Sequence, residues 1–265
     1  FYYIIDWIKK IEGIEKMKLL CTDLDNTLIY SYKHELGNEK RNVELYQGRE
    51  ISFITEKTYE LLKKVNQQYQ IVPVTTRTVE QYQRIHLGIH PFQYALTCNG
   101  GILLVDGKRE DTWYLESRKM TEPAVPAMKK AMEYLEKDAR RKFELRYIEE
   151  LFVFTKCKEV EKVIQDLKKL LKEELVEVFS NGEKLYVLPV TLSKGNAVKR
   201  LKAYLEPDCV IAAGDSEFDK SMVCEADKGF MPEDFPDRLF SEAYSSYFVN
   251  IAFAYQDYGY PYCLA

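Results

Sequence analysis

Two aspartates stand two residues apart in the segment KLLCTDLDNTLIY, Lys18 to Tyr30, directly after a short apolar run. Residues two apart on an extended chain point to the same side, so Asp23 and Asp25 are expected to face one space. Three further polar segments also follow predicted strands: VTTR at 74–77, SKGN at 193–196 and GDSEFD at 214–219. In an open α/β sheet the strand ends share one crevice, where ligands bind. We therefore expect these four segments to form one site.

The residue types in this predicted site suit phosphoryl transfer. Converging carboxylates of Asp23, Asp25 and Asp215 raise one another's pKa values or require a cation, and hard oxygen ligands favour Mg²⁺. Lys194 supplies a positive charge and Thr75 a hydroxyl for phosphoryl oxygens. One carboxylate can attack phosphorus, while a second can protonate the leaving oxygen and later activate water. The sequence thus predicts a magnesium-dependent phosphoryl-transfer site.

Each segment taken alone also has a structural explanation. An aspartate after a strand often caps a helix or makes a turn, and threonines suit strands whatever their function. Ser-Lys-Gly is an ordinary helix start. The combination of all four segments, each at a strand end, favours the functional explanation.

Composition narrows the class of protein. The chain has 265 residues, of which 46% are hydrophobic and 30% charged, as expected of a folded globular protein. The net charge is −4, and acidic and basic residues are interspersed along the chain. The sequence therefore has no basic patch of the kind that binds nucleic acid, and this balance argues against an anionic membrane partner. The six cysteines are scattered without a C-x-x-C pair, so we expect a reduced, cytoplasmic setting.

Alternating strands and helices predict an α/β fold with a doubly wound parallel sheet. A long polar segment, residues 30–54, is expected to be an irregular functional flap. The expected strands are residues 18–22, 70–76 and 209–215, the expected helices are 55–69, 79–87 and 193–204, and a hairpin is expected over 94–108.

The middle third predicts an inserted α+β module. Here we expect a helix over 121–140 capped by Thr121, two strands within 143–157, a helix over 159–174 and a hairpin around Asn181-Gly182. The order helix–strand–strand, given twice, is typical of a small sheet covered by helices. We therefore divide the chain into core residues 1–115, an inserted domain at 116–188 and core residues 189–265.

The two ends and the histidines have simpler interpretations. Residues 1–16 carry an apolar stripe at helical spacing, which predicts a helix packed on the body, with docking to a partner as the alternative. Met17 is an alternative natural start. We expect the aromatic tail, residues 244–262, to pack in the core. His86 and His90 are four apart, but Gly88 and Pro91 do not suit a zinc-binding helix face, so both are interpreted as structural.

The four polar segments resemble the signature motifs of the haloacid dehalogenase superfamily of phosphohydrolases. DLDNTL resembles its D-x-D-x-T opening, VTTR its second-strand Thr/Ser motif, Lys194 its motif lysine and GDSEFD its acidic fourth motif. The resemblance extends from Leu19 to about Met222. Residues between Arg77 and Lys194 lie where some members carry a type 2 (subclass B) cap, as in sucrose-phosphate phosphatase, mannosyl-phosphoglycerate phosphatase and phosphomannomutase. The segment TCNGG at 97–101 resembles the turn that leads into such caps.

This resemblance implies a role for each matching residue. Asp23 would be the nucleophile and Asp25 the general acid and base. Mg²⁺ would be held by Asp23, the main-chain carbonyl of Asp25, and Asp215, with Asp219 close by. Thr75 and Lys194 would bind the phosphoryl oxygens, and Asn99 and Gly100 would lie at the entry to the cap. The implied substrate is a small phosphomonoester, such as a sugar phosphate.

Two positions depart from the family pattern. Thr76 stands where many relatives have glycine, and Phe218 where many have asparagine. We expect the first to narrow the space near the phosphate and the second to remove a polar contact, so the identity of the substrate is left open.

The alternative functions are a phosphomutase, a phospho-accepting signalling domain and a phosphate-binding protein without activity. In the predicted cap, Arg146, Tyr147, Lys184 and Tyr186 could either reach a substrate or simply face solvent.

Overall fold

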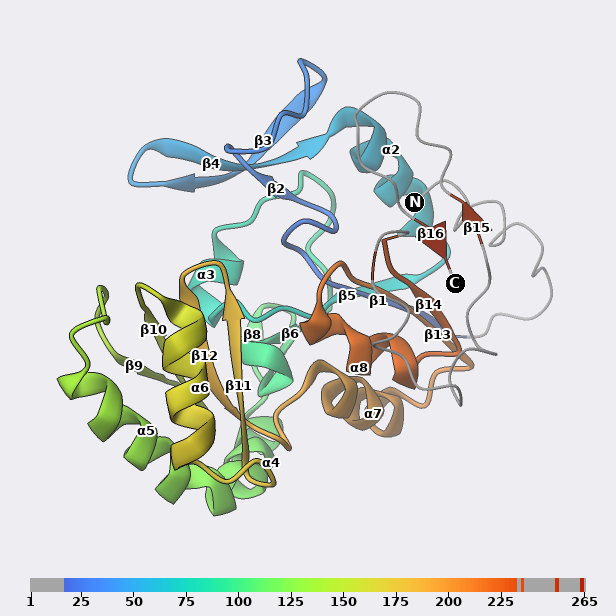
Figure 1. The fold of residues 1–265 in the computed structure, drawn as a ribbon. Coiled ribbons are helices and arrows are strands. Elements are labelled where there is room, and N and C mark those ends of the chain that lie inside the picture. The colour runs from blue at the N-terminus through green and yellow to red at the C-terminus, as the bar shows by residue number, and fades with distance from the viewer. Residues whose placement is uncertain (1–16, 233–234, 236–250, 253–262, 265) are drawn as a thin grey trace. The chain divides into compact units, whose positions relative to one another are not determined.

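The computed structural model describes residues 17–232, 235, 251–252 and 263–264 (Figure 1). The chain divides into two compact units, one formed by Phe1–Arg109 with Lys194–Ala265 and the other by Glu110–Ser193. The helix predicted in residues 1–16 and the core packing predicted for the aromatic tail lie outside the described residues. Among the residues that the structure describes, no helix has the length and apolar character needed to cross a membrane.

A parallel sheet forms the centre of the first unit, and its strands lie side by side in the order β14-β13-β1-β5 (Figure 1). Its strands are β1 Lys18–Thr22, β5 Gln70–Pro73, β13 Cys209–Ala213 and β14 Lys228–Phe230. The short apolar run Leu19–Cys21 is fully buried, as expected for a strand covered on both faces. The register pairs Thr22 with both Ala213 and Pro73, so three strands end at the same level.

Helices and two small antiparallel sheets complete the first unit. The helices are α2 Glu56–Val65, α3 Val79–Gln83, α7 Lys194–Leu205 and α8 Glu217–Glu225. The small sheets contain β2 Tyr30–Ser31, β3 Lys40–Tyr46 and β4 Arg49–Thr55, and β6 Tyr94–Thr97, β7 Ile102–Val105 and β8 Lys108–Arg109. A short pair, β15 Ile251–Ala252 and β16 Cys263–Leu264, is also described. Helix α2 begins after Thr55, whose side chain accepts a hydrogen bond from the Thr58 amide, and its buried face joins the same core as the sheet.

The second unit has its own antiparallel sheet, in the order β11-β12-β10-β9. Its elements are α4 Asp111–Thr121, α5 Val125–Lys137, β9 Arg146–Ile148, β10 Phe152–Lys156, α6 Val160–Leu170, β11 Val176–Asn181 and β12 Lys184–Pro189. Met128, Leu135 and Leu167 from the helices share a core with Val153 and Val187 from the sheet. The predicted fold class, a doubly wound parallel sheet with an inserted α+β module, is confirmed. The domain boundaries at 116 and 188 stay a prediction.

The helix predicted over 121–140 is wrong at its start. Thr121 is the last residue of α4, and its hydroxyl donates to the Arg118 carbonyl at 3.1 Å instead of capping a new helix. The chain then passes through a 3₁₀ turn, Glu122–Ala124, before α5 begins. Pro123 lies within this turn, and because proline has no amide hydrogen it does not continue an α-helical ladder.

The flap predicted as irregular is instead a β-hairpin. Strands β3 and β4 pair from Lys40 to Tyr46, and Gln47 and Gly48 both adopt positive φ in the turn between them. Two residues at positive φ match the right-handed strand twist, as in the Asn-Gly hairpins that are easier to detect. Helix α3 is also shorter than the predicted 79–87, because Ile85 leaves it to form a bridge with Glu44 of β3.

Candidate functional site

The polar segments predicted to meet do lie together at the carboxyl ends of β1, β5 and β13. The Asp23 amide donates to the Ala213 carbonyl at 2.8 Å, which ties the first residue after β1 to the end of β13. The Val74 amide donates to the Thr22 carbonyl, also at 2.8 Å, which brings the segment after β5 alongside. Parallel pairing in this register therefore places Asp23, Thr75 and Asp215 at one edge of the sheet.

Three carboxylates form an acidic cluster at this edge. One oxygen from each of Asp23, Asp215 and Asp219 lies within 4.8 Å of the others, with Asp23 and Asp219 buried. Oxygen donors at this spacing fit a hard divalent cation such as Mg²⁺ better than a soft metal. The side chain of Asp25 does not belong to this group. Asp219, which we expected only near the metal, is itself a member.

Lys194 balances part of this negative charge. It is the first residue of α7 and is 1% exposed, and its Nζ lies 2.5 Å from Oδ1 of Asp23 and 2.5 Å from Oδ1 of Asp219. Burial by itself lowers the pKa of Lys194, but the charges of Asp219 and Asp23 outweigh it and raise that pKa above its ordinary value. Lys194 therefore stays positively charged.

One ammonium group does not neutralise three carboxylates. Burial raises the pKa of Asp23; the charge of Lys194 opposes the rise, whereas Asp219, Asp25 and Asp215 add to it. Burial, followed by the charge of Asp219, raises the pKa of Asp215 from its ordinary 3.8 to about 6. The Thr27 hydroxyl, which donates to Asp215 at 3.1 Å, works in the opposite direction. The cluster therefore favours either a proton or a cation.

Asp219 is held by the start of α8. Its Oδ2 accepts hydrogen bonds from the amides of Asp215 and Ser216 at 3.2 and 3.0 Å, and from the Ser216 hydroxyl at 2.8 Å. Gly214 permits this arrangement, because a Cβ on Gly214 would lie 2.2 Å from the Asp219 Cβ. One oxygen of Asp219 thus fixes the loop after β13 while the other contacts Lys194.

Asp25 lies apart from the cluster and pairs with Arg77. Both of its oxygens accept hydrogen bonds from that guanidinium, at 2.7 Å from Nη2 and 2.8 Å from Nε. Arg77 in turn donates from Nη1 to the buried carboxylate of Glu44 at 2.9 Å. Neither Arg77 nor Glu44 was predicted from the sequence to have a role. Arg77 was within the VTTR motif and was detectable there, whereas nothing distinguished Glu44 from the other charges of its segment.

Thr75 and the turn Cys98–Gly100 support each other. Thr75 is buried; its hydroxyl accepts from the Arg77 amide at 3.1 Å and its carbonyl from the Asn99 amide at 2.9 Å. Cys98 and Asn99 adopt left-handed φ of 52° and 58°, which lets the Cys98 amide also donate to the Arg77 carbonyl. Asn99, with Gly100 next to it, is therefore hydrogen-bonded to the segment that carries Thr75. Contact of Asn99 and Gly100 with a substrate stays a prediction.

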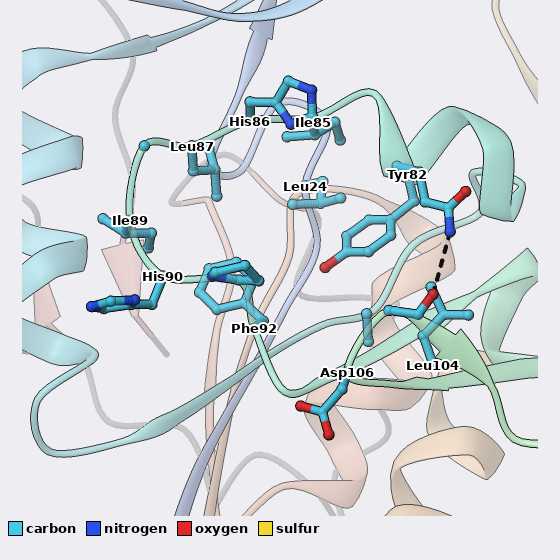
Figure 2. A pocket seen from close by; sticks show the side chains of 15 residues that line it. Leu24, Tyr82, Ile85, His86, Leu87, Ile89, His90, Phe92, Leu104 and Asp106 are labelled. Atoms are coloured by element: carbon cyan, nitrogen blue, oxygen red, sulfur yellow. Dashed lines mark hydrogen bonds between the residues drawn. The ribbon is translucent and has the colours of Figure 1, made fainter.

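A separate pocket of about 410 Å³ lies within the first unit, between the segment after α3 and the β7–β8 turn (Figure 2). Figure 2 shows Leu24, Tyr82 and Phe92 around it, and His86 and His90 also line it. Burial raises the pKa of Tyr82 to about 12, so its phenol stays protonated. Leu24, which lines this pocket, stands between Asp23 and Asp25 in the sequence.

Comparison with known proteins places the chain among related folds. A family model described as haloacid dehalogenase-like hydrolase matches residues 102–246. The sucrose-phosphatase of Synechocystis, solved with sucrose and phosphate, is 16% identical with a TM-score of 0.54, covering 85% of this chain and 86% of its own. A haloacid dehalogenase-like hydrolase of Bacteroides thetaiotaomicron is 16% identical with a TM-score of 0.52, covering 84% and 91%. At such identities the likeness shows the fold. Curated proteins give no significant match to the sequence.

Proposed function

The chain belongs to the haloacid dehalogenase-like hydrolase family, as its motifs predict, and we propose that it is a Mg²⁺-dependent phosphatase of small phosphomonoesters. The observation that carries this proposal is the buried group of Asp23, Asp215, Asp219 and Lys194 at the carboxyl end of the parallel sheet. This group combines a nucleophile, hard oxygen ligands and a fixed cation, which are the parts that phosphoryl transfer requires.

Asp23 is the proposed nucleophile. One of its carboxylate oxygens attacks phosphorus, the bond from phosphorus to the ester oxygen breaks, and Asp25 gives its proton to that leaving oxygen. Water then passes a proton to Asp25 and attacks the phosphorus of the aspartyl-phosphate. As the new bond from the water oxygen to phosphorus forms, the bond between the Asp23 oxygen and phosphorus breaks. Inorganic phosphate leaves, and both carboxyl groups return to their starting states.

Lys194 and Thr75 are the proposed phosphoryl ligands. The Lys194 ammonium is buried beside the attacking oxygen, where low dielectric strengthens its attraction for the charge that develops on the phosphoryl oxygens. The Thr75 hydroxyl follows β5 at the same sheet edge and can donate to a second oxygen. Both groups are fixed before the substrate arrives, so the cost of ordering them is not incurred during reaction.

Mg²⁺ is the proposed cofactor, held by Asp23, Asp215 and the main-chain carbonyl of Asp25, with Asp219 beside them. The oxygen donors of the acidic cluster and the incomplete neutralisation by Lys194 support this assignment. When bound, the ion would supply positive charge to the phosphoryl oxygens.

A sugar phosphate is the proposed substrate class, in a cytoplasmic setting. Support comes from the fold likeness to the sucrose-phosphatase of Synechocystis. In the second unit, the exposed Arg146 and Lys184 offer cationic groups that could bind a phosphorylated or hydroxyl-rich ligand. Tyr186 lies on the same sheet face as Arg146 and Lys184 and could stack against a sugar ring, whereas Tyr147 packs against the core on the opposite face.

The test is phosphate release from p-nitrophenyl phosphate and from a panel of sugar phosphates, with Mg²⁺ or with EDTA. We expect Mg²⁺-dependent turnover by the wild type, and its loss in Asp23→Asn. Asp166→Asn, the same isosteric change outside the acidic cluster, serves as the matched control and should keep full turnover. Absence of phosphate release by the wild type from every compound would reject the proposal, and phosphoryl transfer between hydroxyls without release would identify a mutase.

A further inference from the structure

The pairing with Arg77 fixes the orientation of the Asp25 carboxylate as well as balancing its charge. Two parallel hydrogen bonds, 2.7 Å from Nη2 to Oδ1 and 2.8 Å from Nε to Oδ2, set the plane of the carboxylate against the plane of the guanidinium. Lysine does not reproduce this fork geometry. The side chain of Asp25 is 49% exposed, so it can still exchange protons with solvent while Arg77 holds it.

Arg77 is itself held at both ends. Its amide donates to the Thr75 hydroxyl, and its carbonyl accepts from the Cys98 amide, so its backbone is fixed beside the proposed phosphate ligand. At the far end Nη1 donates to Oε2 of Glu44 at 2.9 Å. With only 14% of its side chain exposed, Arg77 has little freedom to turn away from Asp25.

Glu44 is the anchor of this arrangement. Its side chain is fully buried, and besides Arg77 it accepts from the Ser52 hydroxyl at 2.6 Å and from Nε of Arg84 at 3.3 Å. The register of β3 against β4 shifts on both sides of Glu44, an irregularity of the kind that redirects a side chain. A buried carboxylate is costly unless it is paired and hydrogen-bonded, and here every described partner is a donor.

We propose that Arg77, anchored by Glu44, is a positioning residue that orients Asp25 for proton transfer in the reaction proposed above. The clamp, meaning Glu44, Arg77 and their hydrogen bonds, is compatible with both states of Asp25. When Asp25 carries its proton on one oxygen, the other oxygen still accepts from Arg77. The proton moves between Asp25 and the leaving oxygen or the attacking water, and Arg77 keeps its own protons throughout.

Two substrates whose leaving groups differ in basicity can distinguish a role in positioning Asp25 from a purely structural role of Arg77. Phenyl phosphate and p-nitrophenyl phosphate have similar shapes, but phenolate is far more basic than nitrophenolate and depends more on protonation as it leaves. kcat/KM covers the steps through formation of the aspartyl-phosphate, so the ratio of kcat/KM values for the two esters reports how well Asp25 delivers its proton.

We expect Arg77→Gln to lower kcat/KM for phenyl phosphate about 10-fold more than for p-nitrophenyl phosphate, since general acid catalysis is worth about 10²–10⁴-fold in all. Arg77→Lys keeps the charge without the fork and should show the same selective loss. Glu44→Gln should show a smaller loss in the same direction. Arg49→Gln is the matched control, because Arg49 is an exposed arginine of β4 outside the clamp, and its ratio should equal that of the wild type.

Thermal unfolding of each variant establishes that it is folded. Equal losses for both esters in Arg77→Gln, or full recovery of the ratio in Arg77→Lys, would overturn the positioning role. If Glu44→Gln does not fold, the two Arg77 variants still decide the question. A wild type without Mg²⁺-dependent phosphate release would instead reject the proposed function, so the two failures are distinguishable.

Discussion

The protonation of Asp23 and Asp215 in the acidic cluster depends on the charges around them. The ammonium group of Lys194 lies beside this cluster, and Asp23 and Asp215 both have raised pKa values. Lys194 has a raised pKa as well, because each ammonium–carboxylate contact stabilises the charged lysine while the surplus carboxylates repel one another. A bound cation would relieve that repulsion.

Mg²⁺ binding should therefore depend on pH. Below about pH 6 the Asp215 carboxyl holds a proton that the ion must displace, and above it the ligand is already ionised. We expect the rise in Tm on adding Mg²⁺ to be larger at pH 7.5 than at pH 5. Differential scanning calorimetry at both values checks this, and a rise that is equal at the two values would contradict it.

The metal-free protein supplies the internal control for this prediction. A carboxyl whose pKa is raised by folding binds more protons in the folded state, so its contribution to stability is lost as pH rises from about 4 to about 6. Asp215→Asn should weaken this pH dependence and the response to Mg²⁺ together.

At the level of elements, the position of Lys194 depends on how closely α7 approaches α8. Gly195 makes that approach possible, because a Cβ there would lie 2.6 Å from the Ser221 carbonyl oxygen. The Gly195 amide also donates to the Ser221 hydroxyl at 3.0 Å. Contact between these two helices thus brings the ammonium of Lys194 to Asp219, which lies on α8.

Gly195→Ala should push the two helices apart. Overpacking of this kind typically costs about 1–3 kcal/mol, and it should lower phosphate release as well because Lys194 moves with α7. Chemical denaturation and the phosphatase assay measure the two effects. Lys199→Ala, on the exposed side of the same helix, is the control and should leave both near wild type. Unchanged stability in Gly195→Ala would show that the helices tolerate separation.

At the level of the whole molecule, each unit has its own hydrophobic core. The core of the second unit draws on α5, α6 and three strands of its own sheet, and Met128, Leu135, Val163 and Leu167 are fully buried. Antiparallel strands joined by short turns, such as Asn181 to Lys184, form their contacts locally. Such a unit has the features of an independently folding domain.

We expect residues 110–193, expressed alone, to fold. Circular dichroism should show mixed helix and strand, and thermal unfolding should be a single cooperative transition. A disordered fragment would contradict the prediction. Leu167→Ala, which removes a fully buried side chain from this core, should lower the unfolding free energy of the fragment by about 2–5 kcal/mol.

Elements whose signals are local could be predicted from the amino-acid sequence. Apolar runs such as Leu19–Cys21 predicted buried strands, and polar residues directly after them predicted where a site would form, because parallel strands end at one edge. The turn signal at Asn181-Gly182 predicted a hairpin, and β11 pairs with β12 around it. Resemblance at the four motifs was enough to indicate the family.

Contacts between residues far apart in the sequence could not be predicted and are seen in the folded chain. Arg77 lies 33 positions from Glu44 and 52 positions from Asp25 in the sequence. Neither composition nor periodicity links these residues. Lys194 meets Asp23 across 171 positions because α7 and β1 pack into one unit. A single sequence encodes local conformation through side-chain shape and hydrogen-bonding preference, whereas the pairing of buried charges follows from which elements pack together. That packing brings Glu44 against Arg77, and Arg77 against Asp25.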